Sequence, residues 1–163
     1  MRLVVADTGP PNYLVLIDEI AVLATLFEKV FVPETVIGEL LHQAAPAVVR
    51  DWAMTPPAWL EIVPVSPTTD DRALQALGLG ERAALTLAQD LHAELILMDD
   101  RAAVTVALER GFEVTGTLGL LDLAARRGLI DLAAAIERLK TTSFRYRPEL
   151  LDDLLARHRK GER

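Results

Sequence analysis

Cysteine is absent from this 163-residue chain, and serine is scarce. Without cysteine the protein has no disulfide, no thiolate-bound zinc and no cysteine nucleophile. The two serines, Ser66 and Ser143, lie outside any sequence that forms a nucleophile elbow. No apolar run approaches the length of about 18 residues that a membrane helix needs, and the N-terminus is typical of a strand rather than a cleavable leader. We therefore expect a soluble cytoplasmic protein, with no membrane contact, whose chemistry depends on carboxylates.

Charge is unevenly distributed along the chain. The net charge is −7, but residues 140–163 hold seven Lys and Arg against four Asp and Glu, so this tail carries +3 and the rest −10. An acidic body argues against a protein that coats nucleic acid. The basic tail includes a helix expected at about 148–160, whose last positive charges suit a helix C-terminus. The arginines there are either solvated or form an arm that contacts phosphates.

Short apolar segments alternate with helical segments from one end of the chain to the other. Strands are expected at residues 2–6, 30–32, 60–63, 94–98 and 112–114. Helices are expected at about 13–27, 33–41, 47–54, 102–110, 120–127 and 132–139 and from 148 onward, with a polar turn at 115–119. A further helix is expected between Gly78 and the strand at 94–98, with Glu81 in its first turn. This alternation predicts one α/β domain over residues 1–163, a three-layer sandwich with a central, mostly parallel sheet flanked by helices and right-handed crossovers.

Acidic residues follow two of the predicted strands. Asp7 comes directly after the first strand, and Asp99 and Asp100 follow the strand at 94–98. In open α/β sheets the carboxyl ends of the strands lie at the edge where ligands bind. We therefore expect these three carboxylates to meet at one edge of the sheet.

Two glutamates near helix starts could join them. Glu81 precedes Ala84, Leu85 and Ala88 by three, four and seven residues, so its carboxylate lies on the helix face that is to be buried. Glu39 falls toward the polar side of its helix, where a solvated role is the simpler interpretation. Clustered carboxylates are tolerated when they are solvated, protonated or bridged by cations, and Mg²⁺ and Mn²⁺ prefer oxygen ligands.

Each acid also has a plain structural interpretation. Glu81 in a first helical turn complements the helix dipole, which is worth about 0.3–1 kcal/mol. Asp99 or Asp100 can cap the helix that follows. For any one acid alone, this interpretation is the simpler one.

Two short motifs point to other functions. Residues 78–83, GLGERA, match the dinucleotide fingerprint G-x-G-x-x-A, with an acid about 20 residues later. The fingerprint needs a strand directly before it, whereas residues 72–77 are good helix formers without a β-branched residue. Residues 7–9, DTG, spell an aspartic-protease triplet, but that chemistry pairs two such aspartates and the chain has one copy. A dinucleotide-binding domain is thus the weaker alternative, and a protease is discounted.

Five segments together resemble the PIN-domain family of metal-dependent ribonucleases, especially the branch of toxins from bacterial and archaeal toxin–antitoxin pairs. They are VVADTGP, VPETVIGELL, LGLGERAALTLA, LILMDDRAAV and VTGTLGLLDLA, and they span nearly the whole chain in order. The resemblance implies a site of acids with one further polar residue: Asp7, Glu39, Glu81, Asp99, Asp100 and Thr117.

The resemblance further implies a reaction, a cofactor and partners. It implies in-line hydrolysis of an RNA phosphodiester with one or two Mg²⁺ or Mn²⁺ ions. In that scheme Asp7 and Asp100 contact the metal, Glu81 contacts it directly or through water, and Thr8 and Thr117 donate orienting hydrogen bonds. The protein partner would be a small antitoxin, and the apolar helices at 13–27 and 118–125 predict a homodimer as well. The alternative is a non-catalytic PIN-like module that binds a protein.

Asp99 and Asp100 are expected to have different roles. Successive side chains of a strand point to opposite faces, so both cannot aim at one ion. The resemblance places the metal ligand at Asp100, near the start of the next helix. Asp99 would then hold Arg101 or a neighbouring backbone amide as a supporting group.

Overall fold

The centre of the molecule is a parallel β-sheet. The computed structural model describes residues 2–66 and 69–161, and in this part of the chain the sheet has five strands in the order β3-β2-β1-β4-β5, all parallel. The strands are β1 (Val4–Ala6), β2 (Val30–Pro33), β3 (Leu60–Val63), β4 (Leu95–Leu97) and β5 (Glu113–Thr115). Each strand falls where the sequence predicts one.

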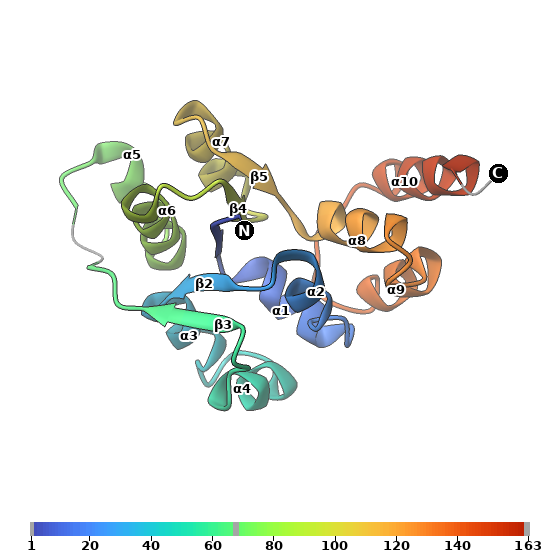
Figure 1. Ribbon diagram of the computed structural model, residues 1–163, viewed down its shortest axis with the longest axis horizontal. Helices are drawn as coiled ribbons and strands as arrows, with labels where there is room; N and C mark the ends of the chain where they lie inside the picture. Colours follow the sequence, from blue (N-terminus) through green and yellow to red (C-terminus); the bar gives the residue numbers. More distant parts are fainter. Residues whose placement is uncertain (1, 67–68, 162–163) are drawn as a thin grey trace.

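Helices connect the strands and cover both faces of the sheet (Figure 1). They are α1 (Gly9–Leu16), α2 (Val22–Phe27), α3 (Glu34–Leu40), α4 (Ala47–Met54), α5 (Arg72–Gln75), α6 (Leu79–Leu91), α7 (Arg101–Glu109), α8 (Thr117–Arg126), α9 (Leu132–Leu139) and α10 (Pro148–Gly161). Among the described residues, none of these helices combines the length and the apolar character needed to cross a membrane.

Alternating side chains of the central strands divide the core into two layers. Val4 and Ala6 of β1 belong to one apolar cluster, which includes buried residues of α1, α2, α3, α4, α8, α9 and α10. Val5, between them, belongs to the other cluster with residues of α5, α6 and α7. This alternation is what a strand with period two produces when both of its faces are covered. The predicted three-layer α/β sandwich is confirmed, and its described sheet is wholly parallel.

The expected helix at residues 13–27 was wrong. Pro10 and Pro11 occupy the first turn of α1, so this helix begins four residues earlier, at Gly9. It ends at Leu16, and Asp18 has a positive φ of 61°, which a helix does not accommodate. Arg138 of α9 donates to the carbonyl of Ile17 at 3.0 Å, so that carbonyl needs no helical partner. The chain therefore turns here before α2.

The order of the strands creates a crevice next to β1. From β1 the chain proceeds to β2 and β3 on one side, and it then crosses back to β4 and β5 on the other. The connections after β1 and β4 thus diverge, which leaves a gap at the carboxyl ends of these two neighbours. Asp7 follows β1 at this gap, and its backbone N–H donates to the carbonyl of Leu97 at 2.9 Å. The topology places Asp7 where such folds bind ligands.

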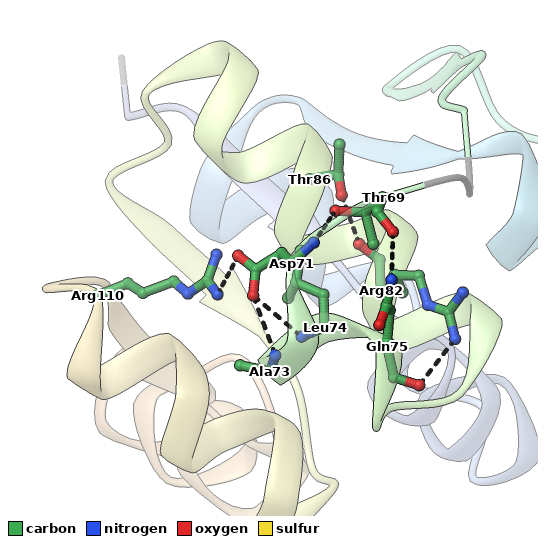
Figure 2. A network of polar contacts seen from close by, with 8 residues as sticks. All are labelled: Thr69, Asp71, Ala73, Leu74, Gln75, Arg82, Thr86 and Arg110. Atoms are coloured by element: carbon green, nitrogen blue, oxygen red, sulfur yellow. Dashed lines mark hydrogen bonds and ion pairs between the residues drawn. The ribbon is translucent and has the colours of Figure 1, made fainter.

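A polar network fixes residues 69–82, which lead into and begin α6 (Figure 2). Asp71 caps α5, and Arg110 after α7 forms an ion pair with it at 2.5 Å. The guanidinium of Arg82 donates to the carbonyls of Gln75 and Leu77, each at 3.1 Å. These contacts hold the N-terminal end of α6 in place against α5 and α7. They therefore support the turn that carries the acid of α6.

Candidate metal centre

A cleft of about 730 Å³ opens at the carboxyl ends of β1 and β4. Its lining includes five of the predicted acids and the predicted threonine of the first loop: Asp7, Thr8, Glu39, Glu81, Asp99 and Asp100. We call it the acidic cleft. The remaining predicted residue, Thr117, is fully buried and reaches the cleft only through its contact with one of these acids. Side chains from five different segments are thus brought to one place by the fold.

Asp7 is the most deeply placed of these acids. Only 5% of its surface is exposed, and its Oδ1 atom has no hydrogen-bond partner within the described part of the chain. Burial raises the pKa of Asp7 from 3.8 to about 7, a hydrogen bond from the Thr8 backbone opposes this rise, and the nearby carboxylates of Glu81, Glu39 and Asp100 add to it. Asp7 is therefore a buried carboxylate without a compensating positive charge among the described residues.

Glu39 and Glu81 enter the cleft from α3 and α6, which pack against each other. The Thr8 hydroxyl donates to the Glu39 carboxylate. Burial is the main cause that raises the pKa of Glu81, which is half-buried, and Asp100 and Glu39 contribute by repulsion. The carboxylate of Glu81 also lies close to Gly78, the N-cap residue of α6. Glu81 therefore fits both the helix-dipole interpretation and the metal-site interpretation, because it lies near the start of its own helix and also lines the acidic cleft.

Asp99 joins β4 to the start of α8. Its carboxylate accepts hydrogen bonds from the Thr117 backbone N–H at 2.7 Å and from the Thr117 hydroxyl at 2.6 Å. The N-cap residue of α8 is Gly116, which has no side chain, so Asp99 supplies the cap from another element. Burial raises the pKa of Asp99, and the two bonds from Thr117 oppose the rise. Of the two partners expected for Asp99, the backbone amide is thus confirmed, although it belongs to Thr117, which is 18 positions away, and no contact with Arg101 occurs among the described residues. The expectation that residues 115–119 form only a turn was wrong, because α8 begins at Thr117.

Asp100 caps α7. Its Oδ1 atom accepts from the backbone N–H of Ala103 at 2.9 Å, which is the ordinary N-cap contact. The side chain is exposed at the cleft and close enough to raise the pKa of both Asp7 and Glu81. Asp100 thus caps a helix, as the structural interpretation predicted, and it also belongs to the acids that line the cleft.

The fit of a divalent cation to this cleft can be judged from the oxygens present. Within residues 2–66 and 69–161, no three Asp, Glu or His side chains form a group that could hold a metal ion as they stand. The orphaned Oδ1 of Asp7, however, is a buried carboxylate oxygen with three acids nearby, and no cation from residues 2–66 or 69–161 pairs with it. Hard cations such as Mg²⁺ and Mn²⁺ take this kind of donor. The donor chemistry therefore fits a hard cation at Asp7.

The side of the cleft nearest α10 consists of residues that sequence reasoning did not assign to it. Tyr13 of α1 packs edge-on against Phe144, with ring centroids 5.1 Å apart, and its hydroxyl lies 3.3 Å from the Ser143 hydroxyl. Arg145, next to Phe144 in sequence, also lines the cleft, and so does Arg101 at the start of α7. Tyr13 and Phe144 are 131 positions apart, so no local pattern could connect them. The one usable signal was the run of arginines in the tail.

The glycines of the apparent dinucleotide motif have a different role. Residues 72–75 form α5, so no strand precedes the motif as a nucleotide-binding turn requires. A Cβ added at Gly80 would lie 2.5 Å from both Glu39 carboxylate oxygens, and one at Gly78 would overlap the Glu81 carboxylate. The two glycines thus leave space for acids rather than for a pyrophosphate. The dinucleotide interpretation is not supported by the fold.

The sequence was compared with protein families, curated proteins and solved structures. The family model DUF3368, described as a PIN domain, matches residues 3–160. No curated protein and no solved structure gives a significant match. PIN domains are generally nucleases, and they typically use divalent metals. Because this family model matches nearly the whole chain, the protein belongs to the PIN-domain family.

Proposed function

We propose that this protein is a metal-dependent endoribonuclease that hydrolyses RNA phosphodiester bonds, and that it is the toxin of a toxin–antitoxin pair. The observation that carries the proposal is Asp7, a buried carboxylate with an unpartnered oxygen at the topological switch point. The acids around it supply further oxygen ligands. Family membership supports nuclease chemistry. The choice of RNA and the role as a toxin go beyond family membership and are part of the proposal.

Three acids would hold Mg²⁺ or Mn²⁺ in this scheme, namely Asp7, Glu81 and Asp100. The ion would act as a Lewis acid that activates water and stabilises charge on the leaving oxygen. Because the pKa of Asp7 is about 7, part of the population is protonated at neutral pH, and cation binding displaces that proton. The exposed Asp100 caps α7 through Oδ1, and its Oδ2 has no hydrogen-bond partner in the described part of the chain.

Supporting residues keep these ligands in position. Thr8 donates to Glu39, which fixes that carboxylate between the first loop and α6. Thr117 holds Asp99 with two hydrogen bonds and so ties the end of β4 to α8. Residues of this kind orient metal ligands, and their loss typically reduces activity about 10- to 100-fold.

A second candidate function is a non-catalytic PIN-like module that binds protein. One observation favours it, namely that no three acids among the described residues already form a group able to hold a metal. Metal-dependent cleavage separates the two functions. The test incubates the purified protein with labelled single-stranded RNA and Mn²⁺, with and without EDTA. We expect cleavage that EDTA abolishes, whereas cleavage that survives EDTA, or no cleavage at all, would remove the metal mechanism.

Partners form a further part of the proposal. The apolar residues that suggested a dimer, such as Leu14 and Leu121, are buried in the protein's own core. These side chains are therefore not available for contact with a second copy of the chain. Val48 and Met54 of α4 and Ile62 of the edge strand β3 are exposed instead. We propose that this surface forms the homodimer contact, and that an apolar helix of a small antitoxin binds the protein in the cell.

A further inference from the structure

A second cavity, also of about 730 Å³, adjoins the acidic cleft. The two share Arg101 and Arg145, which therefore stand between them. The rest of the second cavity is lined by the chain that leads into α10 and by the first turns of that helix: Tyr146, Arg147, Glu149, Leu150 and Asp153. We call it the flanking cavity. None of the residues that line only this cavity has a part in the proposed metal centre.

The lining of the flanking cavity holds three arginines and two acids, and the arginines form no ion pair with the protein within the described residues. These arginines, Arg101, Arg145 and Arg147, are all exposed. Guanidinium groups bind phosphate oxygens in a planar, bidentate manner. Three such groups beside a cleft for a phosphodiester are suited to a further phosphate of the same strand.

The chain that presents these cations is anchored. Phe144 packs against Tyr13 of α1, and the Phe144 backbone N–H donates to the Thr142 hydroxyl at 3.2 Å. Ser143 contacts the Tyr13 hydroxyl as well. The backbone before Arg145 is thus fixed against the first helix. The long arginine side chains beyond it remain available to a ligand.

An apolar surface lies beside the cations. Tyr146 is 37% exposed and Leu150 is 47% exposed, and both line the flanking cavity. An exposed aromatic ring beside guanidinium groups is the arrangement that stacks an unpaired base while the phosphate is held. A base inside a duplex is already stacked and cannot use the ring.

We propose that the flanking cavity binds the nucleotide next to the scissile phosphodiester in single-stranded RNA. Arg101 and Arg145 hold the phosphate between the two cavities, Arg147 adds to this contact, and the base stacks on Tyr146. The inference rests on the proposed function, because it takes the acidic cleft as the place of cleavage. It adds a subsite beside the cleft, which lets the strand extend past the cut on the side of α10.

Two acids on the wall of the cavity narrow the choice of ligand. Glu149 and Asp153 lie one helical turn apart on α10 and both line the cavity. Their charges repel a polyphosphate that would fill the whole space, whereas their oxygens accept hydrogen bonds from the amino groups of a base. The lining therefore favours one phosphate and one base over a free polyphosphate or an acidic peptide.

Binding is measured without cleavage, by fluorescence anisotropy of a labelled 12-nucleotide single-stranded RNA in EDTA at several salt concentrations. We expect Arg145→Ala and Arg147→Ala to weaken binding and to reduce the salt slope by about 0.7 each, the value for one phosphate contact on a single strand. Tyr146→Ala should weaken binding roughly 5- to 100-fold with no change in slope, as loss of base stacking does. Tyr146→Phe should bind like the wild type.

Arg127→Ala is the matched control, because Arg127 is exposed, has no ion pair among the described residues and lines neither cavity. The inference is overturned if the cavity variants bind like this control, or if Tyr146→Ala has no effect. It is also overturned if the RNA duplex of the same sequence or a polyglutamate of equal charge binds as tightly as the single strand. Single-strand binding that depends on the cavity, without cleavage in Mn²⁺, would refute the proposed nuclease and leave the binding site standing.

Discussion

The carboxylate of Glu39 lies against Gly80, so closely that a Cβ at position 80 would stand 2.5 Å from both of its oxygens. Glu39 belongs to α3 and Gly80 to the first turn of α6. The same carboxylate accepts a hydrogen bond from Thr8, which follows β1. Because Gly80 has no side chain, the Glu39 side chain of α3 can cross the start of α6 and reach Thr8 in the loop after β1.

Gly80→Ala should impair metal binding and RNA cleavage with little loss of stability. The added methyl group displaces the flexible Glu39 carboxylate from Thr8, while alanine favours the helix over glycine by up to about 1 kcal/mol. We expect Mn²⁺ affinity by calorimetry, and the cleavage rate, to fall about 10- to 100-fold, as for other supporting groups of metal ligands.

Gly38→Ala is the control for this substitution. Gly38 lies in α3, beside Glu39, and a Cβ there would meet nothing within 4 Å. This variant should keep wild-type metal affinity and gain helix stability. Equal activity of the two variants would show that the position of Glu39 does not matter to the site.

The residues around Gly80 also show what sequence could and could not predict. Periodicity identified α6 and put Glu81 on its buried side, and the helix formers before it argued correctly against a nucleotide-binding strand. The match of GLGERA to a phosphate-binding motif was nevertheless accidental. Its second glycine, Gly80, leaves space for Glu39, 41 positions earlier, and this contact exists only after α3 and α6 have packed.

Asp7→Asn should abolish metal-dependent cleavage and leave the fold intact. The substitution keeps the size of a side chain that is 5% exposed, and it removes the charge that a cation at the switch point requires. We expect no Mn²⁺ binding by calorimetry and a circular dichroism spectrum like that of the wild type. Full cleavage by a well-folded Asp7→Asn protein would exclude Asp7 as a ligand.

The stability of the metal-free protein should depend on pH through Asp7. Its folded-state pKa is raised from 3.8 to about 7, so between these values the native state holds a proton that the unfolded state has lost. The free energy of unfolding therefore falls as pH rises through this window, by up to about 4 kcal/mol at roughly 1.4 kcal/mol per pKa unit.

The measurement compares wild type with Asp7→Asn by urea unfolding in EDTA at pH 4.5 and at about pH 8, since the difference cancels the titration of other groups. We expect the wild type to lose stability relative to the variant as pH rises. A constant difference across this range would mean that Asp7 titrates at its ordinary pKa.

The exposed apolar surface near α4 should form a homodimer. Met54 is 71% exposed and Val48 is 52% exposed, and α4 packs on α3, which in turn contacts the edge strand β3. We expect light scattering at tens of micromolar to give the mass of two chains, and Met54→Glu to give the mass of one. Leu108→Glu, a similar change on exposed α7 of the opposite layer, should leave the dimer intact. A monomeric wild type at this concentration would refute the dimer.

The two adjacent aspartates show a second boundary of prediction from sequence. That Asp99 and Asp100 must differ followed from the pleat of a strand, and the structure gives them different partners. The partner of Asp99 could not be found locally, because Thr117 starts a helix 18 positions later and reaches Asp99 only because β5 lies beside β4. The role of each aspartate toward a metal stays a prediction.

Asp99→Asn and Asp100→Asn should therefore fail in different ways. Asparagine caps a helix about as well as aspartate, so Asp100→Asn keeps the contact with the Ala103 backbone and the stability of α7. It removes one of the charges that face Asp7. We expect this variant to unfold like the wild type but to lose Mn²⁺ binding and RNA cleavage.

Asp99→Asn should cost stability first. Asp99 accepts from the backbone N–H and from the hydroxyl of Thr117. Asparagine can keep the first bond through its oxygen, and it can donate its amide to the hydroxyl once the hydroxyl rotates to accept, so two charge-assisted bonds become weaker neutral ones. We expect a loss of about 1–3 kcal/mol in urea unfolding, with Mn²⁺ affinity reduced about 10- to 100-fold rather than lost. If Asp99→Asn loses the metal and Asp100→Asn retains it, the two roles are reversed. If both retain it, the end of β4 is not part of the metal centre, and the proposed nuclease site would have to rest on Asp7 and Glu81 alone.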